Sequence, residues 1–236
     1  MSGNAARLRQ SGRYRSAAMS GPVLLRPSHT AELKRCMNPE SQYAAPFRPM
    51  GANSSATDCT SSTGTVIDLT GLDRILKVDI DRGIVAVQPG VRIGSLVEEL
   101  AEYGYELAGG HDLMSRTVGG AVAGGSIGPT FGDEGALLAS QVESLKIVTP
   151  DGSPIVIRRN QEQLMHAFRL SFGMLGVIYE IRLRIRPIRN FAVAHRSCSF
   201  DQFGGVAEKL AAADVGLKFF IMPVSYKHLR AHETVT

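Results

Sequence analysis

The chain has 236 residues, of which 44% are hydrophobic and 20% charged, a composition typical of a globular protein with a sizeable core. No segment approaches the roughly 18 uncharged apolar residues of a membrane-spanning helix, so a spanning protein is excluded. The three cysteines have no metal-binding spacing. We therefore expect neither a disulfide scaffold nor a metal site.

The net charge of +4 comes from the N-terminal end of the chain. Residues 1–27 hold five arginines and no acid, whereas the rest holds 21 basic and 22 acidic residues. Because the body lacks a basic excess, we expect no nucleic-acid partner. Residues 1–21 predict a disordered or targeting tail, and their Arg-rich composition also fits a mitochondrial import signal. A cytoplasmic location is the first expectation, and mitochondrial import is the alternative.

Short elements are predicted from Pro27 onward. Ser28 is expected to cap a helix over 30–34, and residues 47–55 form a polar, turn-rich stretch. A buried strand over 66–69, a hairpin of 75–80 with 84–88, and an amphipathic helix over 93–101 ending at Gly104 follow. Next come a hairpin of 145–149 with 155–157, a helix over 161–171 and a strand over 181–186 closed by Pro187.

This mixture of strands, hairpins and helices predicts the α+β class. We expect one domain over residues 22–188 and the truncated start of a second domain over 189–221. Residues 222–236 resemble translated sequencing-adapter read-through, so we expect them to be an artefact. The natural protein is then expected to continue into a part that this sequence lacks.

Two segments are expected to leave their backbone amides uncovered by side chains. In Gly51–Ser55, successive small residues can form a nest of N–H groups that holds a diphosphate without a lysine. Residues 117–126 hold four glycines, which are costly unless something large lies against the backbone, such as a flat ring system. A surface loop and a tight packing turn are the alternatives, and neither segment has the GxGxxG pattern.

The order of six short motifs carries a family resemblance. They are Phe47–Ser55, Thr65–Leu69, Val87–Val91, Thr117–Gly120, Val148–Gly152 and Ser171–Ile178. In this order they resemble the PCMH-type FAD-binding domain of the vanillyl-alcohol oxidase family, and most of all its sugar-acid lactone (aldonolactone) and alditol oxidases. The resemblance implies two α/β subdomains with FAD between them.

The resemblance also implies which residues contact FAD. Residues 50–55 would wrap the diphosphate, residues 117, 120 and 124–127 would lie beside the ribityl chain and isoalloxazine, and residues 176–178 would lie on the adenine side. Asp112 would add a contact. The full set is Met50, Gly51, Ala52, Asn53, Ser54, Ser55, Asp112, Thr117, Gly120, Gly124, Gly125, Ser126, Ile127, Gly176, Val177 and Ile178.

Two positions depart from the family pattern. Members that attach FAD covalently carry His where this chain has Asn53, so we predict non-covalent FAD. Ile127 stands where relatives carry another His, which puts the redox tuning of those relatives in doubt for this chain.

The resemblance implies an FAD-dependent oxidoreductase that oxidises a hydroxyl-bearing carbon of a small sugar-derived alcohol or lactone. A hydride would pass to flavin N5 and then to oxygen or another acceptor. The substrate residues of this family come largely from the second domain, so the sequence assigns no catalytic residue, and this fragment is expected to be inactive alone. A D-2-hydroxyacid dehydrogenase and a degenerate, non-catalytic binding module remain the alternatives.

Overall fold

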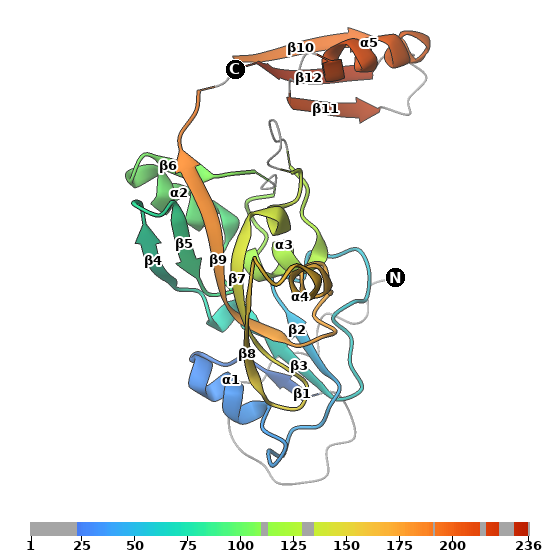
Figure 1. Ribbon diagram of the computed structural model, residues 1–236. Coiled ribbons are helices and arrows are strands. Elements are labelled where there is room, and N and C mark those ends of the chain that lie inside the picture. The colour runs from blue at the N-terminus through green and yellow to red at the C-terminus, as the bar shows by residue number, and fades with distance from the viewer. Residues whose placement is uncertain are drawn as a thin grey trace.

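The computed structural model describes residues 23–109, 113–128, 135–190, 192–212, 216–221 and 229–235. Two sheets and their helices form the body, and a third small sheet with one helix follows β9 (Figure 1). The elements of the first subdomain are β1 (Val23–Leu25), α1 (Thr30–Cys36), β2 (Phe47–Met50), β3 (Thr65–Asp68) and η1 (Leu69–Gly71).

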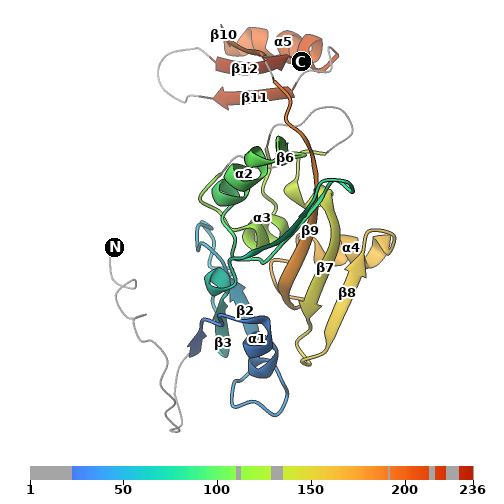
Figure 2. The ribbon, with the colours of Figure 1, turned by 90° about the vertical axis from the view of Figure 1, so that its left-hand side faces the viewer.

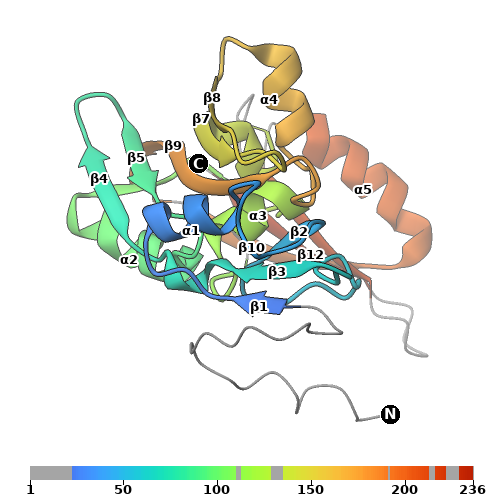
Figure 3. The same ribbon diagram turned by 90° about the horizontal axis from the view of Figure 1, so that it is seen from below.

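The first subdomain is a parallel three-stranded sheet in the order β1-β3-β2. Leu33 of α1 and Ile67 of β3 are fully buried in one cluster, and Figure 3 shows α1 beside β3. The cap of α1 differs from the prediction: His29 is the N-cap residue and makes no side-chain capping bond. Instead the backbone N–H of Ser28 donates to the Glu32 carboxylate at 2.9 Å, so the acidic side chain reaches back to the helix start.

The second subdomain is built on a six-stranded sheet. Its elements are β4 (Ile75–Asp79), β5 (Ile84–Val87), α2 (Ile93–Glu102), β6 (Tyr105–Leu107), α3 (Val118–Gly124), η3 (Leu138–Gln141), β7 (Val142–Val148), β8 (Pro154–Arg158), α4 (Glu162–Phe168) and β9 (Val177–Pro187). The strand order is β4-β5-β9-β7-β8, with β6 paired to β9, and the pairs are antiparallel. Both predicted hairpins are confirmed.

Two helices pack on this sheet and complete its core. Leu96 of α2 and Val122 of α3 are fully buried in one cluster with Leu145 of β7 and Ile181 of β9, and Figure 2 shows both helices beside the sheet. The periodicity that predicted α2 is confirmed, and the helix ends before Gly104, whose φ is +72°. The mixture of sheets and helices in the two subdomains confirms the predicted α+β class.

A C-terminal unit follows Pro187. It consists of β10 (Ala192–Cys198), α5 (Phe200–Ala212), β11 (Gly216–Ile221) and β12 (Leu229–Val235), with the strands antiparallel in the order β10-β12-β11. The stretch predicted to be a read-through artefact thus supplies the central strand of this sheet. The assignment of residues 189–221 and 222–236 stays a prediction.

Candidate flavin site

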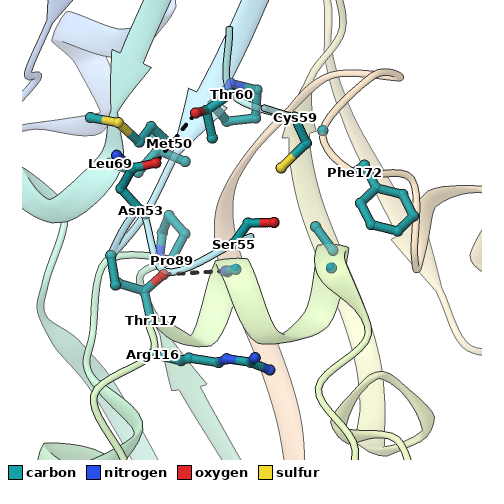
Figure 4. A pocket seen from close by; sticks show the side chains of 18 of the residues that line it. Met50, Asn53, Ser55, Cys59, Thr60, Leu69, Pro89, Arg116, Thr117 and Phe172 are labelled. Carbon is teal, nitrogen blue, oxygen red and sulfur yellow. Dashed lines mark hydrogen bonds between the residues drawn. The ribbon is translucent and has the colours of Figure 1, made fainter. Parts of the chain in front are cut away.

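A cavity lies between the two subdomains and is lined by three segments that are far apart in the chain. The first is the loop after β2, the second is α3 with the two residues before it, and the third is the segment between α4 and β9 (Figure 4). The predicted residues that line the cavity are Met50, Gly51, Ala52, Asn53, Ser54, Ser55, Thr117, Gly120, Gly124, Gly176 and Ile178. The structure therefore brings together most of the set that the sequence singled out.

The loop after β2 presents free backbone donors. The N–H groups of Ala52, Asn53 and Ser54 donate to no described residue, and Asn53 and Ser54 are exposed. Asn53 has a φ of +51°, a left-handed conformation that Asn tolerates better than most residues. Its Oδ1 accepts a hydrogen bond from the Thr60 hydroxyl at 3.4 Å, which closes the loop on itself (Figure 4). Such an arrangement can hold an anion through main-chain donors alone.

The Gly-rich segment is a helix, which the sequence did not predict. Thr117 is the N-cap of α3, and its Oγ1 accepts from the Gly120 N–H at 3.3 Å. The N–H of Val118 donates to Val91 O and that of Gly119 to Pro89 O, both at 2.8 Å. The expected free amides therefore exist in the loop but not in the first turn of α3, where the protein itself accepts them.

What α3 offers the cavity is a face without side-chain bulk. Gly120 and Gly124 lie one helical turn apart, and both line the cavity and are exposed. A Cβ added at Gly124 would meet no atom within 4 Å, and one at Gly120 would meet only Thr117 Oγ1, at 3.1 Å. The opposite face of the helix, with Val118 and Val122, is fully buried in the core. A flat group can therefore lie directly on the helix backbone.

One charged side chain lines the cavity among the described residues, and it is Arg116. Its Nη1 is 3.5 Å from Ser126 Oγ, and no carboxylate of a described residue lies within ion-pair distance. Figure 4 shows the Arg116 side chain running alongside α3. A cavity whose only charged side chain is an unpaired cation suits a ligand that carries negative charge.

Five predicted residues lie apart from the cavity lining or outside the description. Gly125 is the left-handed C-cap of α3, with a φ of +75°, and Ser126 is buried behind it. Ile127 has 66% of its surface exposed, and Val177 is fully buried in the core of the first subdomain. Asp112 lies outside the described residues. Their contacts with FAD stay predictions.

Sequence reasoning missed several residues that line the cavity, among them Cys59, Thr60, Arg116 and Phe172. Arg116 directly precedes a predicted residue, and Phe172 lies inside the Ser171–Ile178 motif. Their positions in the sequence could therefore have identified both as candidates for the site. No feature of the sequence identified Cys59 and Thr60, because only the fold of the loop after β2 brings them to the cavity.

Comparison with known proteins agrees with this geometry. The family model described as FAD binding domain matches residues 22–158, more than half of the chain. The chain belongs to this FAD-binding family, and FAD is the cofactor of the domain. The free loop amides, the bare face of α3 and the lone cation of Arg116 all fit a flat cofactor with a diphosphate.

Three relatives found by sequence are named as lactone enzymes. The chain is 31% identical to the L-gulono-1,4-lactone dehydrogenase of Mycobacterium tuberculosis, covering 88% of this chain and 47% of the relative. It is 28% identical to the mitochondrial L-galactono-1,4-lactone dehydrogenase of Arabidopsis thaliana, covering 84% of this chain and 32% of the relative. The L-gulonolactone oxidase of Bos taurus is 25% identical, covering 70% of this chain and 37% of the relative.

The chain thus spans between about a third and about a half of the length of these relatives. Among solved structures, an alkyldihydroxyacetonephosphate synthase matches with a TM-score of 0.73 and 18% sequence identity. That match covers 90% of this chain and 46% of the other, and it supports the fold alone. Among the described residues, no helix has the length and apolar character needed to cross a membrane.

Proposed function

We propose that this chain is the FAD-binding part of an oxidoreductase that oxidises a hydroxyl-bearing carbon of a sugar-derived lactone. The observation that carries the proposal is the coincidence of an FAD-binding family match with relatives that are named as dehydrogenases or oxidases of aldonolactones. These names favour a lactone over a D-2-hydroxy acid as the substrate. Electrons would pass to oxygen or to another acceptor.

The residues of the cavity have separate roles in this proposal. The free N–H groups of Ala52, Asn53 and Ser54 hold the diphosphate, each through a charge-assisted hydrogen bond worth about 1.5–3 kcal/mol. The open face of α3 at Gly120 and Gly124 gives the cofactor a flat surface at close range. When bound, FAD supplies the hydride acceptor for the chemistry. The protein contributes its position and the charge around it.

The cofactor is held without a covalent bond in this proposal. Asn53 lines the cavity, and its carboxamide has no nucleophilic ring nitrogen. The family resemblance implies that members with attached flavin carry His at this position. Flavin should therefore separate completely from the polypeptide on acid denaturation and filtration. Flavin that stays with the denatured chain would contradict this part of the proposal.

The substrate side of the site is proposed to lie outside the FAD-binding domain. Residues 189–221 would begin the domain that supplies catalytic groups, and this chain alone would bind FAD more weakly than a chain that includes a complete second domain. Residues 1–21 are rich in Arg, and a relative is named as mitochondrial. These observations support the mitochondrion as the first compartment to test.

The test has two stages. The 236-residue chain is first titrated with FAD, and binding is followed by calorimetry. The longer reading frame from the source genome is then loaded with FAD and mixed anaerobically with L-gulono-1,4-lactone, L-galactono-1,4-lactone or D-lactate. Loss of the oxidised-flavin absorbance with a lactone supports the proposal, and loss with D-lactate alone contradicts it. A protein that binds no flavin in either form would favour the non-catalytic module.

A further inference from the structure

Phe172 is the only aromatic side chain among the described residues that line the cavity. It lies in the segment between α4 and β9, and 50% of its surface is exposed. Figure 4 shows the ring beyond the end of α3, facing the same space as the helix. Because half of its surface is exposed, packing against the protein accounts for only part of the position of this ring.

The backbone at Phe172 is in an unfavourable conformation. Its φ is +51°, and that of Leu170 is +60°, so two bulky residues of one short segment are left-handed. Only Gly, and less often Asn or Asp, visits this region without a steric cost. Strained residues of this kind persist where the surroundings determine them, and they cluster at ligand sites.

The surrounding contacts determine the position of this segment. The N–H of Phe172 donates to Ala123 O at 3.0 Å, and that of Leu170 donates to Val122 O at 3.3 Å. These bonds use carbonyl groups at the end of α3 that have no partner within the helix. On the next residue, a Cβ at Gly173 would overlap the ring of Pro49 before the loop. The segment is thus fixed to both other walls of the cavity.

This arrangement places an aromatic ring next to the bare end of α3. Gly124 lines the cavity at that end and leaves open space around its Cα. Gly124 and Phe172 line the same cavity, and the Phe172 N–H bonds to Ala123 O at this end of the helix, so a flat molecule lying on the helix end would come close to Phe172. Aromatic side chains in such positions bind planar heterocycles by stacking.

We propose that Phe172 is a cofactor-binding residue whose ring stacks on a planar heterocycle of FAD. Adenine and isoalloxazine share the required chemistry, and the experiment distinguishes them. The proposal depends on the assignment of FAD as the cofactor and is independent of the proposed oxidation of a lactone. The strained backbone is then the cost of presenting the ring to the cofactor.

Five forms of the 236-residue chain test the proposal: the unmodified chain, Phe172→Gly, Phe172→Leu, Phe172→Trp and Leu170→Gly. Phe172→Gly removes the ring and relieves the left-handed strain, so its melting temperature should equal or exceed that of the unmodified chain. Phe172→Leu keeps an apolar side chain without an aromatic face. Leu170→Gly is the matched control, because it relieves the same strain at a residue that does not line the cavity.

Calorimetric titrations with FAD, FMN and ADP give the readout. Phe172→Gly and Phe172→Leu should weaken FAD binding at least about fivefold, whereas Phe172→Trp and Leu170→Gly should stay within about twofold of the unmodified chain. A parallel loss for ADP assigns adenine as the stacked ring, and a loss for FMN assigns isoalloxazine.

The proposal is overturned if Phe172→Leu binds FAD as the unmodified chain does, or if Leu170→Gly loses as much affinity as Phe172→Gly. A loss for FAD with no loss for either ADP or FMN overturns it as well. Failure of both the unmodified chain and the longer reading frame to bind FAD would instead overturn the cofactor assignment, which separates the two outcomes.

Discussion

Gly51 lies so close to Thr117 that a side chain at position 51 would overlap the Thr117 hydroxyl group. Gly51 begins the loop after β2 in the first subdomain, and Thr117 caps α3 in the second. Both residues line the cavity. This contact is therefore the point at which the loop after β2 and the bare helix α3 are held together at one cavity.

Gly51→Ala should destabilise the chain and weaken FAD binding, because the new methyl group forces the loop away from Thr117. Overpacking of this kind costs about 1–3 kcal/mol. Urea denaturation and FAD titration measure the two effects. Thr117→Ala alone should cost about 1 kcal/mol through loss of the helix cap.

The double variant Gly51→Ala, Thr117→Ala checks the cause of the effect. Because the second substitution removes the atom that the first one overlaps, the double variant should lose less stability than the sum of the two single losses. Additive losses would show that the close approach of Gly51 to Thr117 is not the source of the effect.

Asp151 gives the β7–β8 turn a pH-dependent contribution to stability. Hydrogen bonds lower the pKa of its carboxyl, first from the Thr149 hydroxyl and then from the Ser153 side chain, whose Oγ lies 3.0 Å from Oδ2. Because the folded-state pKa is lowered, this stability is present above the unfolded-state pKa of about 3.9 and is lost as the pH falls through the folded-state value. Asp151→Asn should therefore destabilise the chain slightly at neutral pH and less in acid. Urea denaturation near pH 7 and near pH 3 measures this, and an equal loss at both would contradict it.

The hairpins and α2 could be predicted from sequence because their signals are local. The turn Asp151-Gly152 and the apolar spacing of Ile93, Leu96 and Leu100 each specify one backbone shape. Helix α3 could not be predicted from sequence, because three of its seven residues are glycine and its intrinsic helix propensity is poor. Burial of Val118, Ala121 and Val122 in the core, together with the Thr117 cap, overrides that propensity.

The site could be predicted in part for the same reason. The motifs identified the loop at Met50–Ser55 and the glycines of α3, because runs of small residues and closely spaced glycines can be recognised in the sequence itself. The left-handed backbone of Phe172 and the arrival of Cys59 at the cavity depend on contacts between segments. No local pattern in the sequence specifies such contacts.

Gly124 and Gly119 both line the cavity, but only Gly119 is packed tightly against another part of the protein. A Cβ at Gly124 would meet nothing within 4 Å, so Gly124→Leu should leave the free energy of unfolding within about 0.5 kcal/mol and weaken FAD binding about tenfold or more. A Cβ at Gly119 would lie 2.6 Å from Pro89 Cβ, so Gly119→Ala should cost about 1–3 kcal/mol of stability.

Thermal denaturation of each apo variant, followed by FAD titration of the same sample, makes the comparison. Gly120→Val is a less specific test, because its Cβ would press on Thr117 Oγ1 at 3.1 Å and mix the two effects. If Gly124→Leu binds FAD with unchanged affinity, the cofactor does not lie on this face of the helix.

Arg116 should contribute a salt-sensitive part of the affinity for FAD. Its guanidinium is the one charge at the cavity among the described residues, and the diphosphate of FAD is anionic. Arg116→Gln should weaken FAD binding about tenfold at low ionic strength, and the difference should shrink as added salt screens the pair. Arg158→Gln is the matched control, because it removes the same charge from an exposed position on β8 that does not line the cavity.

Calorimetric titrations at low and high sodium chloride measure both variants. An equal loss in the two would assign the effect to net charge, and an unchanged affinity in Arg116→Gln would show that the cation does not face the cofactor.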